Sequence, residues 1–315
     1  MRALVTGIAG FAGSHLAEHL LAAGDEVRGL TRAAAWPANL AGLEDRLSLT
    51  AVDLCDESAT CAAVTAAAPE VIYHLAARAS AAAAHREPVA TLRDNVATCA
   101  TVLAAAAACR PRPRVLLVTS SDIYGLPPGD QPLDEQTPFN PPNAYAVSKV
   151  AAHYLGRQRW LSDGLEVVEA RPFNHLGPRQ GRGFVVPDFA SQLAAIARGQ
   201  AEPHLLVGDL RAGRDFSDVR DIVRGYRLLA VAGRPGEAYH LCRGCSLTIA
   251  ELLDRLLALS GVTARVEIDP ARLRPSPPSV VIGSAAKIEA ELGWRPQISL
   301  DQTLADALAD WRARP

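Results

Sequence analysis

Short apolar runs alternate with stretches of helical period along the first half of the chain. The apolar runs occupy residues 2–6, 26–30, 46–54, 71–77, 114–121 and 165–173. Between them, apolar side chains recur at spacings of three and four residues, which predicts helices over 14–24, 95–109 and 145–161. Strands that alternate with helices are typical of βαβ units, and strands with few polar residues are typical of parallel sheets covered on both faces. The pattern therefore predicts an α/β fold of the Rossmann type, with a doubly wound parallel sheet.

The pattern changes after Arg171. The next segment is rich in proline, glycine and arginine and has no clear period, which is typical of a binding segment. Beyond it we expect a helix with Asp188 as its N-cap, and a strand at 237–242 that rejoins the main sheet. The sequence therefore predicts a dinucleotide-binding domain over 1–171, rejoined by about 214–243, and a smaller C-terminal α/β substrate-binding domain over 172–315.

Composition excludes some classes of function. The chain has 315 residues, of which 49% are hydrophobic, enough for a large core. Its formal net charge of -2 is spread without long blocks, unlike the one-sided basic surface that nucleic-acid binding needs. The first residues enter an apolar strand without a charged leader, and the apolar tracts are too short to span a membrane. We therefore expect a cytoplasmic protein that binds neither nucleic acid nor membrane.

The cysteines predict no metal site. The sequence has six of them, and their spacing does not resemble a disulfide framework. Cys242 and Cys245 form a CxxC pair, but a second CxxC pair is lacking. We expect these two side chains to pack as ordinary residues.

A glycine-rich turn follows the first predicted strand and precedes the first predicted helix. It reads TGIAGFAG over Thr6–Gly13. Gly7 permits a tight turn, Gly10 lets the backbone approach a pyrophosphate, and Gly13 lets the helix pack close to the sheet. The N-terminus of the helix offers unpaired N–H groups to the anion. This context predicts a dinucleotide site.

The end of the second predicted strand indicates which dinucleotide binds. Where NAD-binding proteins usually carry a carboxylate for the ribose hydroxyls, this chain has Thr31 and Arg32. A cation suits the 2′-phosphate of NADP, so we expect NADP(H) to be preferred and NAD(H) to be possible; a solvated surface arginine is the alternative. Asp53 follows the third predicted strand within reach of an adenine amino group, and helix capping is its alternative role.

Candidate catalytic groups follow the strand at 114–121. It ends with Ser120 and Ser121 at the carboxyl edge of the sheet, where open α/β folds bind ligands. Tyr145 and Lys149 lie four residues apart on a helix and therefore share one face. A lysine ammonium beside a phenol is expected to lower the pKa of the tyrosine, which would then exchange protons with a carbonyl or alcohol. These groups predict an oxidoreductase site beside a nicotinamide.

These motifs carry a resemblance. The segments TGIAGFAG, HLAA, SSDIYG, YAVSK and RPFN resemble the extended short-chain dehydrogenase/reductase family, which acts on nucleotide sugars. The finer pattern over 171–192 and 207–223 resembles its GDP-mannose 4,6-dehydratase and GDP-6-deoxy-4-keto-mannose reductase branch, and the likeness covers nearly the whole chain. The resemblance implies an NAD(P)-dependent nucleotide-sugar oxidoreductase whose partner is a nucleotide-diphosphate sugar, with a GDP-sugar expected. It also implies a homodimer formed through the helices at 95–109 and 145–161.

The resemblance implies roles for individual residues. Ser120, Tyr145 and Lys149 match its catalytic positions, and Asn174, Arg214 and Arg274 match positions that hold the sugar nucleotide. A guanidinium fork suits a diphosphate, which supports the two arginines. Further cofactor contacts are implied at Phe11, Ala12, Leu54, Ala76, Ala77 and Pro172. Further substrate contacts are implied at Ser80, Ser121, Val185 and Gly208.

Departures from the pattern favour a reductase over a dehydratase. A 4,6-dehydratase needs another acid/base group besides the tyrosine, and the resemblance expects threonine and glutamate where this chain has Ser120 and Asp122. Asp122 is a candidate acid/base group, but it is one methylene shorter. We therefore expect NADPH-dependent reduction of the 4-keto group of a GDP-4-keto-6-deoxyhexose, which forms GDP-6-deoxy-D-mannose, also called GDP-D-rhamnose. A separate departure is Pro277, which stands where the resemblance expects an acidic residue that binds the guanosine ribose, and this weakens the case for guanine as the base. The alternatives are GDP-mannose 4,6-dehydratase, another nucleotide-sugar dehydratase or epimerase, and a non-catalytic nucleotide-sugar binding protein.

Overall fold

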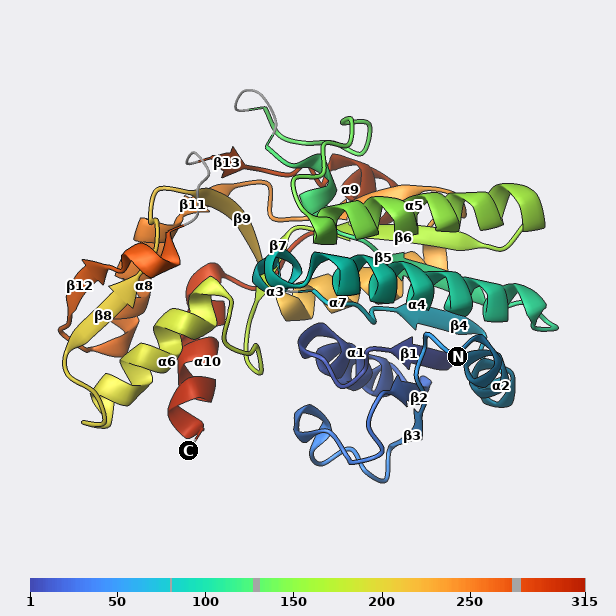
Figure 1. Cartoon of the computed structure of the whole chain (residues 1–315), viewed down its shortest axis with the longest axis horizontal. Helices are drawn as coiled ribbons and strands as arrows, with labels where there is room; N and C mark the ends of the chain where they lie inside the picture. Colours follow the sequence, from blue (N-terminus) through green and yellow to red (C-terminus); the bar gives the residue numbers. More distant parts are fainter. Residues whose placement is uncertain (80, 127–130, 274–278, 315) are drawn as a thin grey trace.

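The main sheet consists of seven parallel strands in the computed structural model, which describes residues 1–79, 81–126, 131–273 and 279–314. Figure 1 shows this sheet in the larger part of the molecule. From edge to edge its strands are β10 (Ala238–Leu241), β6 (Val167–Pro172), β5 (Arg114–Val118), β4 (Val71–His74), β1 (Arg2–Thr6), β2 (Glu26–Thr31) and β3 (Leu47–Ala51). The predicted Rossmann-type α/β fold is confirmed.

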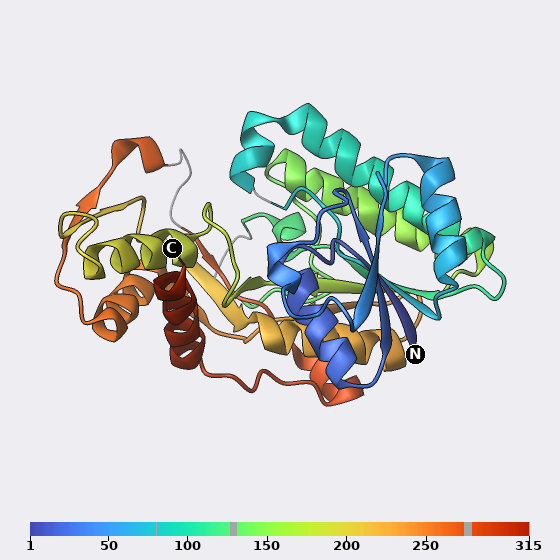
Figure 2. The same cartoon turned by 90° about the horizontal axis from the view of Figure 1, so that it is seen from below.

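Helices cover both faces of this sheet (Figure 2). One face carries α1 (Phe11–Ala22) and α7 (Val219–Ala232), and the other carries α2 (Glu57–Ala67), α4 (Pro88–Ala108) and α5 (Ala144–Asp163). Between the sheet and each helical layer lies a separate apolar core. All the residues of β4 and β6 are buried, which explains why the strands lack the polar alternation of a half-exposed sheet. The short helix α3 (Ala81–Arg86) precedes α4.

A smaller lobe follows β6 and has a core of its own (Figure 1). Its strands form a sheet in the order β11-β9-β13, with β7 beside β9, and a separate pair, β12-β8. Their bounds are β7 (Asn174–Leu176), β8 (His204–Val207), β9 (Gly213–Asp218), β11 (Ser246–Thr248), β12 (Arg265–Ile268) and β13 (Val280–Val281). The helices of the lobe are α6 (Val185–Ala197), α8 (Ile249–Ser260) and α10 (Leu300–Ala313), while α9 (Ala286–Leu292) lies against β10.

The chain passes between the two parts more than once. It leaves the main sheet after β6, returns to it through α7 and β10, and then enters the lobe again at β11. β10 pairs with β6 in parallel, from Ala238 opposite Glu169 to Leu241 opposite Pro172. The domain boundaries drawn from the sequence stay a prediction.

One expected helix start is wrong. Helix α6 begins at Val185 with Phe184 as its N-cap, whereas Asp188 lies within the first turn. Pro187 fits there because the first-turn N–H groups have no partner within the helix. Asp188 instead accepts a hydrogen bond from the Gly183 N–H at 2.9 Å. Within the described ranges, every helix is too short or too polar to cross a bilayer.

Candidate active site

The glycine-rich turn between β1 and α1 has a shape that only glycine permits at two positions. Gly7 adopts φ +73°, and a Cβ there would lie 2.8 Å from the backbone nitrogen of Ala76. A Cβ on Gly13 would lie 2.2 Å from the carbonyl oxygen of Gly7. Gly10 is the N-cap of α1, and no side chain caps this helix end. The first-turn N–H groups, which belong to Phe11 and the residues after it, therefore suit a pyrophosphate, and the turn fits a dinucleotide.

The end of β4 holds this turn in place. Ala76 donates its N–H to Thr6 Oγ1 at 3.3 Å, and Thr6 Oγ1 also pairs with His74 Nδ1 at 2.9 Å. Burial, together with the positive charge of Lys149, lowers the pKa of His74 to about 3, so its ring is neutral. Ala77 follows, half-buried. Sequence reasoning missed the role of Thr6 and His74, although both stand inside motifs that it singled out.

The residues expected near the adenosine lie at the carboxyl ends of β2 and β3. Arg32 is exposed and directly follows β2, whose Thr31 pairs with Ala51 of β3. Asp53 is also exposed, and its carboxylate accepts the N–H of Cys55 at 3.0 Å. Helix α2 is capped by a different residue, Asp56. Capping is therefore not the role of Asp53. Leu54, beside it, is buried.

Ser120, Tyr145 and Lys149 come together at the end of β5. Ser120 lies just beyond the strand, and all three residues are less than a tenth exposed. Lys149 Nζ lies 5.8 Å from the centroid of the Tyr145 ring and donates a hydrogen bond to the carbonyl oxygen of Val118 at 2.8 Å. Helix α5 begins just before Tyr145, where Asn143 caps its N-terminus by accepting the Ala146 N–H at 2.9 Å.

The protonation of this group differs from the sequence-based expectation. Burial raises the pKa of Tyr145, the negative charge of Asp122 raises it further, and a hydrogen bond with Ser120 opposes both. The predicted lowering of the tyrosine pKa is therefore wrong. Spacing along a helix gives no measure of burial, which dominates here. Burial also lowers the pKa of Lys149 to about 8, which leaves the amine charged at neutral pH.

Asp122 and Ser121 belong to the turn of 3-10 helix η2 (Ser121–Tyr124) that follows Ser120. Ser120 accepts the N–H of Asp122 at 3.1 Å, which fixes the start of this turn. Ser121 is buried and Asp122 is half-buried. The negative charge of the Asp122 carboxylate raises the pKa of the Tyr145 phenol, so the two candidates are close enough to interact.

Two residues expected at the substrate lie on neighbouring strands of the smaller lobe. Asn174 is exposed and begins β7, opposite Phe216 of β9. Arg214 of β9 is half-buried, and its Nη1 donates to the carbonyl oxygen of Ser279 at 2.7 Å. His175 stacks on Phe11 with ring centroids 5.9 Å apart, so the lobe contacts the start of α1.

The remaining expected residues are more scattered. Pro172 is the buried last residue of β6, Val185 is the first residue of α6, and Gly208 directly follows β8. Ser80, Arg274 and Pro277 lie outside the described residues. Arg179, which lies in the segment after β7, pairs with Glu18 at 2.7 Å.

The fold and this site define a class. A doubly wound parallel sheet, a glycine-rich turn and a serine, tyrosine and lysine at one strand end are the features of an NAD(P)-dependent oxidoreductase of the extended short-chain dehydrogenase/reductase type. A family model described as GDP-mannose 4,6 dehydratase matches residues 4–307. The chain belongs to this family, which confirms the resemblance read from the motifs.

Three matches to known proteins show how far the similarity extends. GDP-6-deoxy-D-mannose reductase of Pseudomonas aeruginosa is 34% identical over 314 residues, covering 99% of this chain and 98% of the relative. The solved structure of RMD from Pseudomonas aeruginosa complexed with NADPH has a TM-score of 0.86 at 31% identity and covers both chains fully, at 100% of each. UDP-glucose 4-epimerase of Thermus thermophilus in complex with NAD has a TM-score of 0.87 at 29% identity, with 99% of each chain covered.

Proposed function

We propose that this chain is an NADPH-dependent reductase of the 4-keto group of a GDP-4-keto-6-deoxyhexose, which forms GDP-6-deoxy-D-mannose. One observation carries the proposal: the similarity to GDP-6-deoxy-D-mannose reductase extends over 99% of this chain and 98% of the relative. The class of site agrees with this reaction, because carbonyl reduction needs a proton donor, a second hydroxyl and a cofactor turn, all of which the chain has.

The protonation of Tyr145 suits the reductive direction. A reduced nicotinamide, when bound, supplies a hydride to the carbonyl carbon. Tyr145 then donates its phenolic proton to the carbonyl oxygen, and the raised pKa keeps this proton in place at neutral pH. Ser120 Oγ holds the same oxygen during the transfer. Tyr145 is thus the general acid of the proposed reaction.

Lys149 stabilises the phenolate that remains after the transfer. Its ammonium is anchored on the Val118 carbonyl oxygen 2.8 Å away and lies beside the Tyr145 ring. A positive charge in a buried site favours a neighbouring anion. The lysine therefore acts on the tyrosine after the proton has left, rather than by making the resting phenol acidic.

Arg214 and Asn174 are proposed to hold the nucleotide diphosphate. Arg214 is anchored through one guanidinium nitrogen, Nη1, on the carbonyl oxygens of Gly213 and Ser279, each at 2.7 Å. Asn174 starts the strand next to the strand of Arg214. A fixed guanidinium and an exposed amide supply the donors that a diphosphate accepts.

A dehydratase remains the second candidate because the matching family model is described by that activity. The extra acid/base group that this reaction needs would be Asp122, which is half-buried and acts on the Tyr145 phenol. Its negative charge raises the tyrosine pKa and so disfavours the phenolate that oxidation of a sugar hydroxyl requires. Proton donation by the reductase leaves the same phenolate, so this charge acts on both activities, and the shorter side chain of Asp122 is what favours the reductase.

Two assays separate these functions. With the purified protein and NADPH, a GDP-4-keto-6-deoxyhexose should cause loss of the absorbance of the reduced cofactor, with one GDP-6-deoxyhexose formed for each NADPH consumed. With GDP-mannose and NADP⁺, no 4-keto-6-deoxy product should appear. Formation of that product identifies a dehydratase, and inertness in both assays with retained nucleotide binding identifies a binding protein.

Arg32 is expected to set the preference for NADPH over NADH. Replacing Arg32 with serine should raise the KM for NADPH by about 10- to 100-fold, because one charge-assisted contact with the 2′-phosphate is lost. The KM for NADH should change by less than about threefold. The matched control is Arg28→Ser, since Arg28 lies on β2, which Arg32 directly follows, and pairs with Glu26 at 2.7 Å. Equal changes of the KM for NADPH and for NADH would show that Arg32 does not contact the 2′-phosphate.

The homodimer and the cytoplasmic location stay predictions. A homodimer through α4 and α5 is supported by exposed apolar side chains, since Val147, Tyr154 and Leu161 follow one line along α5 and Val89 lies on α4. These four are 42%, 57%, 67% and 76% exposed. A cytoplasmic location also stays a prediction from the sequence.

A further inference from the structure

The carboxylate of Glu169 receives four hydrogen bonds in the interior, close to the candidate active site. Its Oε1 accepts from Thr119 Oγ1 at 2.6 Å and from Arg171 Nε at 3.0 Å. Its Oε2 accepts from His153 Nδ1 at 2.7 Å and from Arg171 Nη2 at 3.0 Å. An ionised carboxylate has about four acceptor positions, so the capacity of Glu169 is filled. We call Thr119, His153, Glu169 and Arg171 the carboxylate cluster.

This carboxylate is charged. Burial opposes its ionisation, but the hydrogen bond from His153 and the charge and hydrogen bonds of Arg171 outweigh burial and lower the pKa of Glu169 to about 2. An ionised carboxylate only accepts hydrogen bonds, so Nδ1 of His153 carries a proton. The cluster is therefore an ionic network in which the buried carboxylate has a hydrogen-bond donor at each acceptor position.

Each donor of the cluster leads to a different part of the site. Thr119 directly precedes Ser120 at the end of β5. His153 lies on α5, four residues after Lys149 and eight after Tyr145, on the same face of the helix.

Arg171 also donates through Nη1 to the hydroxyl of Tyr124 at 2.7 Å, and Tyr124 ends the turn that begins with Ser121. One carboxylate thus connects the serine strand, the tyrosine helix and the turn between them.

The end of β5 is also the anchor of Lys149. Lys149 Nζ donates to the carbonyl oxygen of Val118, the residue before Thr119. A shift of this strand end against α5 would therefore move Ser120 away from Tyr145 and change the position of the ammonium as well. The bond from Thr119 to Glu169 resists that shift.

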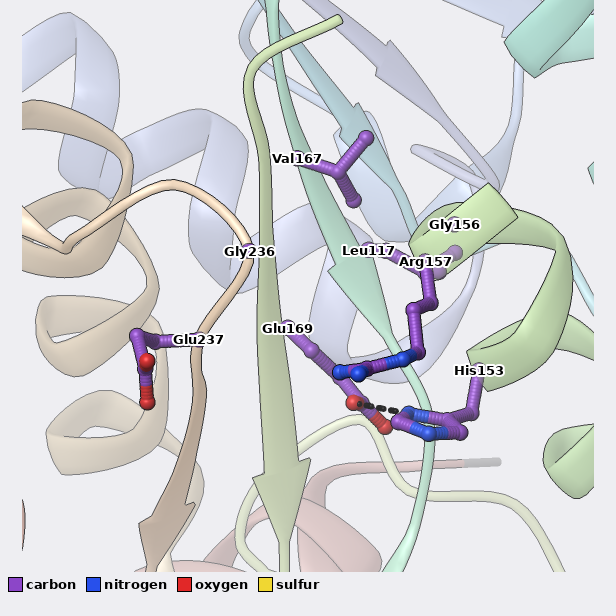
Figure 3. Close-up of a pocket in the computed structure, with 8 residues that line it drawn as sticks. All are labelled: Leu117, His153, Gly156, Arg157, Val167, Glu169, Gly236 and Glu237. Carbon is purple, nitrogen blue, oxygen red and sulfur yellow. Dashed lines mark hydrogen bonds and ion pairs between the residues drawn. The ribbon is translucent and has the colours of Figure 1, made fainter. Parts of the chain in front are cut away.

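Glu169 has no room to touch a substrate. Figure 3 shows its side chain between β6 and α5, pointing toward His153, with Arg157 nearby. The cavity beside it measures about 20 Å³, enough for about one water molecule and far too small for a nucleotide sugar. Residues that line it include His153, Glu169 and Glu237, whereas Ser120, Tyr145 and Lys149 do not. Any effect of Glu169 on the reaction must act through its neighbours.

We propose that Glu169 is a positioning residue, whose hydrogen bonds to Thr119 and His153 hold Ser120 of the β5 end in register with Tyr145 and Lys149 on α5. This inference rests on the proposed function. It assigns a reaction-related role to a buried residue of β6 that the proton transfer itself does not use. Misplacement of reacting groups by about 1 Å can cost about 100-fold in rate, so a link of this kind affects turnover more than binding.

The test uses pairs of variants that remove one donor and restore it. Thr119→Val keeps the shape and the main-chain bond from Thr119 N to the Ala170 carbonyl oxygen, but removes the hydroxyl donor, whereas Thr119→Ser keeps that donor. We expect Thr119→Val to lower kcat by about 10- to 100-fold while the KM and Kd for NADPH change by less than about twofold. Thr119→Ser should stay within about threefold of the wild-type kcat. Glu169→Ala is avoided because it would leave Arg171 buried without its partner.

The second pair acts on the helix side. His153→Leu removes the donor to Glu169, and His153→Asn restores an N–H at nearly the same distance from the backbone as Nδ1. We expect a loss of kcat in the first that the second largely recovers. Asp163→Asn is the matched control, since it breaks the ion pair with Arg159 on the same helix, 2.7 Å long, without touching the cluster. Its kcat should equal that of the wild type.

The outcomes separate this proposal from the proposed function. Equal kcat in Thr119→Val and Thr119→Ser, or a loss of kcat that Asn at position 153 does not recover, overturns the positioning role. A wild-type protein that binds NADPH but does not turn over the keto-sugar overturns the proposed function instead. In that case the hydrogen exchange of the amides at 144–153 tests the positioning role. Exchange should become faster in Thr119→Val and His153→Leu but not in Thr119→Ser. Unchanged exchange in the first two variants overturns the positioning role.

Discussion

Replacing Tyr145 with phenylalanine should lower kcat by about 100- to 10,000-fold, the usual contribution of a general acid. The affinity for NADPH should stay within about twofold, because a single hydroxyl is removed and the ring remains. The burial that raises the pKa of this phenol is also the reason why water is poorly placed to replace it as the donor. Stopped-flow absorbance of NADPH measures the rate, and fluorescence titration measures the affinity.

The control for this variant is Tyr154→Phe. Tyr154 lies on the same helix but is 57% exposed, and the variant keeps the ring that packs against His153. Its kcat should match the wild type. A Tyr145→Phe protein with full rate would show that another group delivers the proton, with Asp122 the first to examine.

Replacing Gly13 with alanine should disrupt both folding and cofactor binding. The new Cβ would lie 2.2 Å from the carbonyl oxygen of Gly7 and 2.8 Å from Cα of Ile8, and both are backbone atoms that cannot rotate aside. We expect the free energy of unfolding to fall by about 3 kcal/mol, at the upper end of the range for overpacked sites. NADPH binding should weaken by about tenfold or more, because relief of the clash moves the phosphate-binding turn. Urea denaturation and fluorescence titration measure the two effects.

Alanine substitutions at two other glycines serve as comparisons for Gly13→Ala. A Cβ on Gly10 would lie 3.2 Å from the carbonyl oxygen of Gly7, so Gly10→Ala should cost less than Gly13→Ala. A Cβ on Gly181 meets nothing within 4 Å, so Gly181→Ala should change neither quantity. Equal stability and NADPH affinity in Gly13→Ala and Gly181→Ala would mean that the turn is looser than its geometry indicates.

Local features of the sequence predicted much of the fold. The apolar run over 2–6 is a strand because parallel strands are buried on both faces, and the glycines that follow it stand where a side chain would strike backbone. Tyr145 and Lys149 were assigned to one helical face from their spacing alone, and α5 carries them there. Each of these inferences depends on residues that are close along the chain.

Features that depend on distant residues were beyond the reach of sequence reasoning. Glu169 meets Thr119 across 50 residues, and no local pattern pairs them. The direction of the Tyr145 pKa was wrong because it depends on burial by the surrounding fold and on Asp122, which comes from a different element. The prediction of Asp188 as the N-cap is wrong because α6 already begins at Val185, and an acidic residue in the first turn of a helix looks like a cap in sequence.

The position of β10 late in the sequence, at Ala238–Leu241, limits where the chain can be cut into soluble fragments. Strand β10 covers the open edge of β6, and the buried face of α7 packs Val219, Ile222 and Tyr226 into the core of the main sheet. A fragment that stops at Pro172 would present an unpaired strand edge and a bare apolar surface, the two conditions that promote aggregation. During synthesis the edge of β6 stays unpaired until the chain has been made as far as Leu241. A soluble fragment of the nucleotide-binding half must therefore include the lobe segment between β6 and β10.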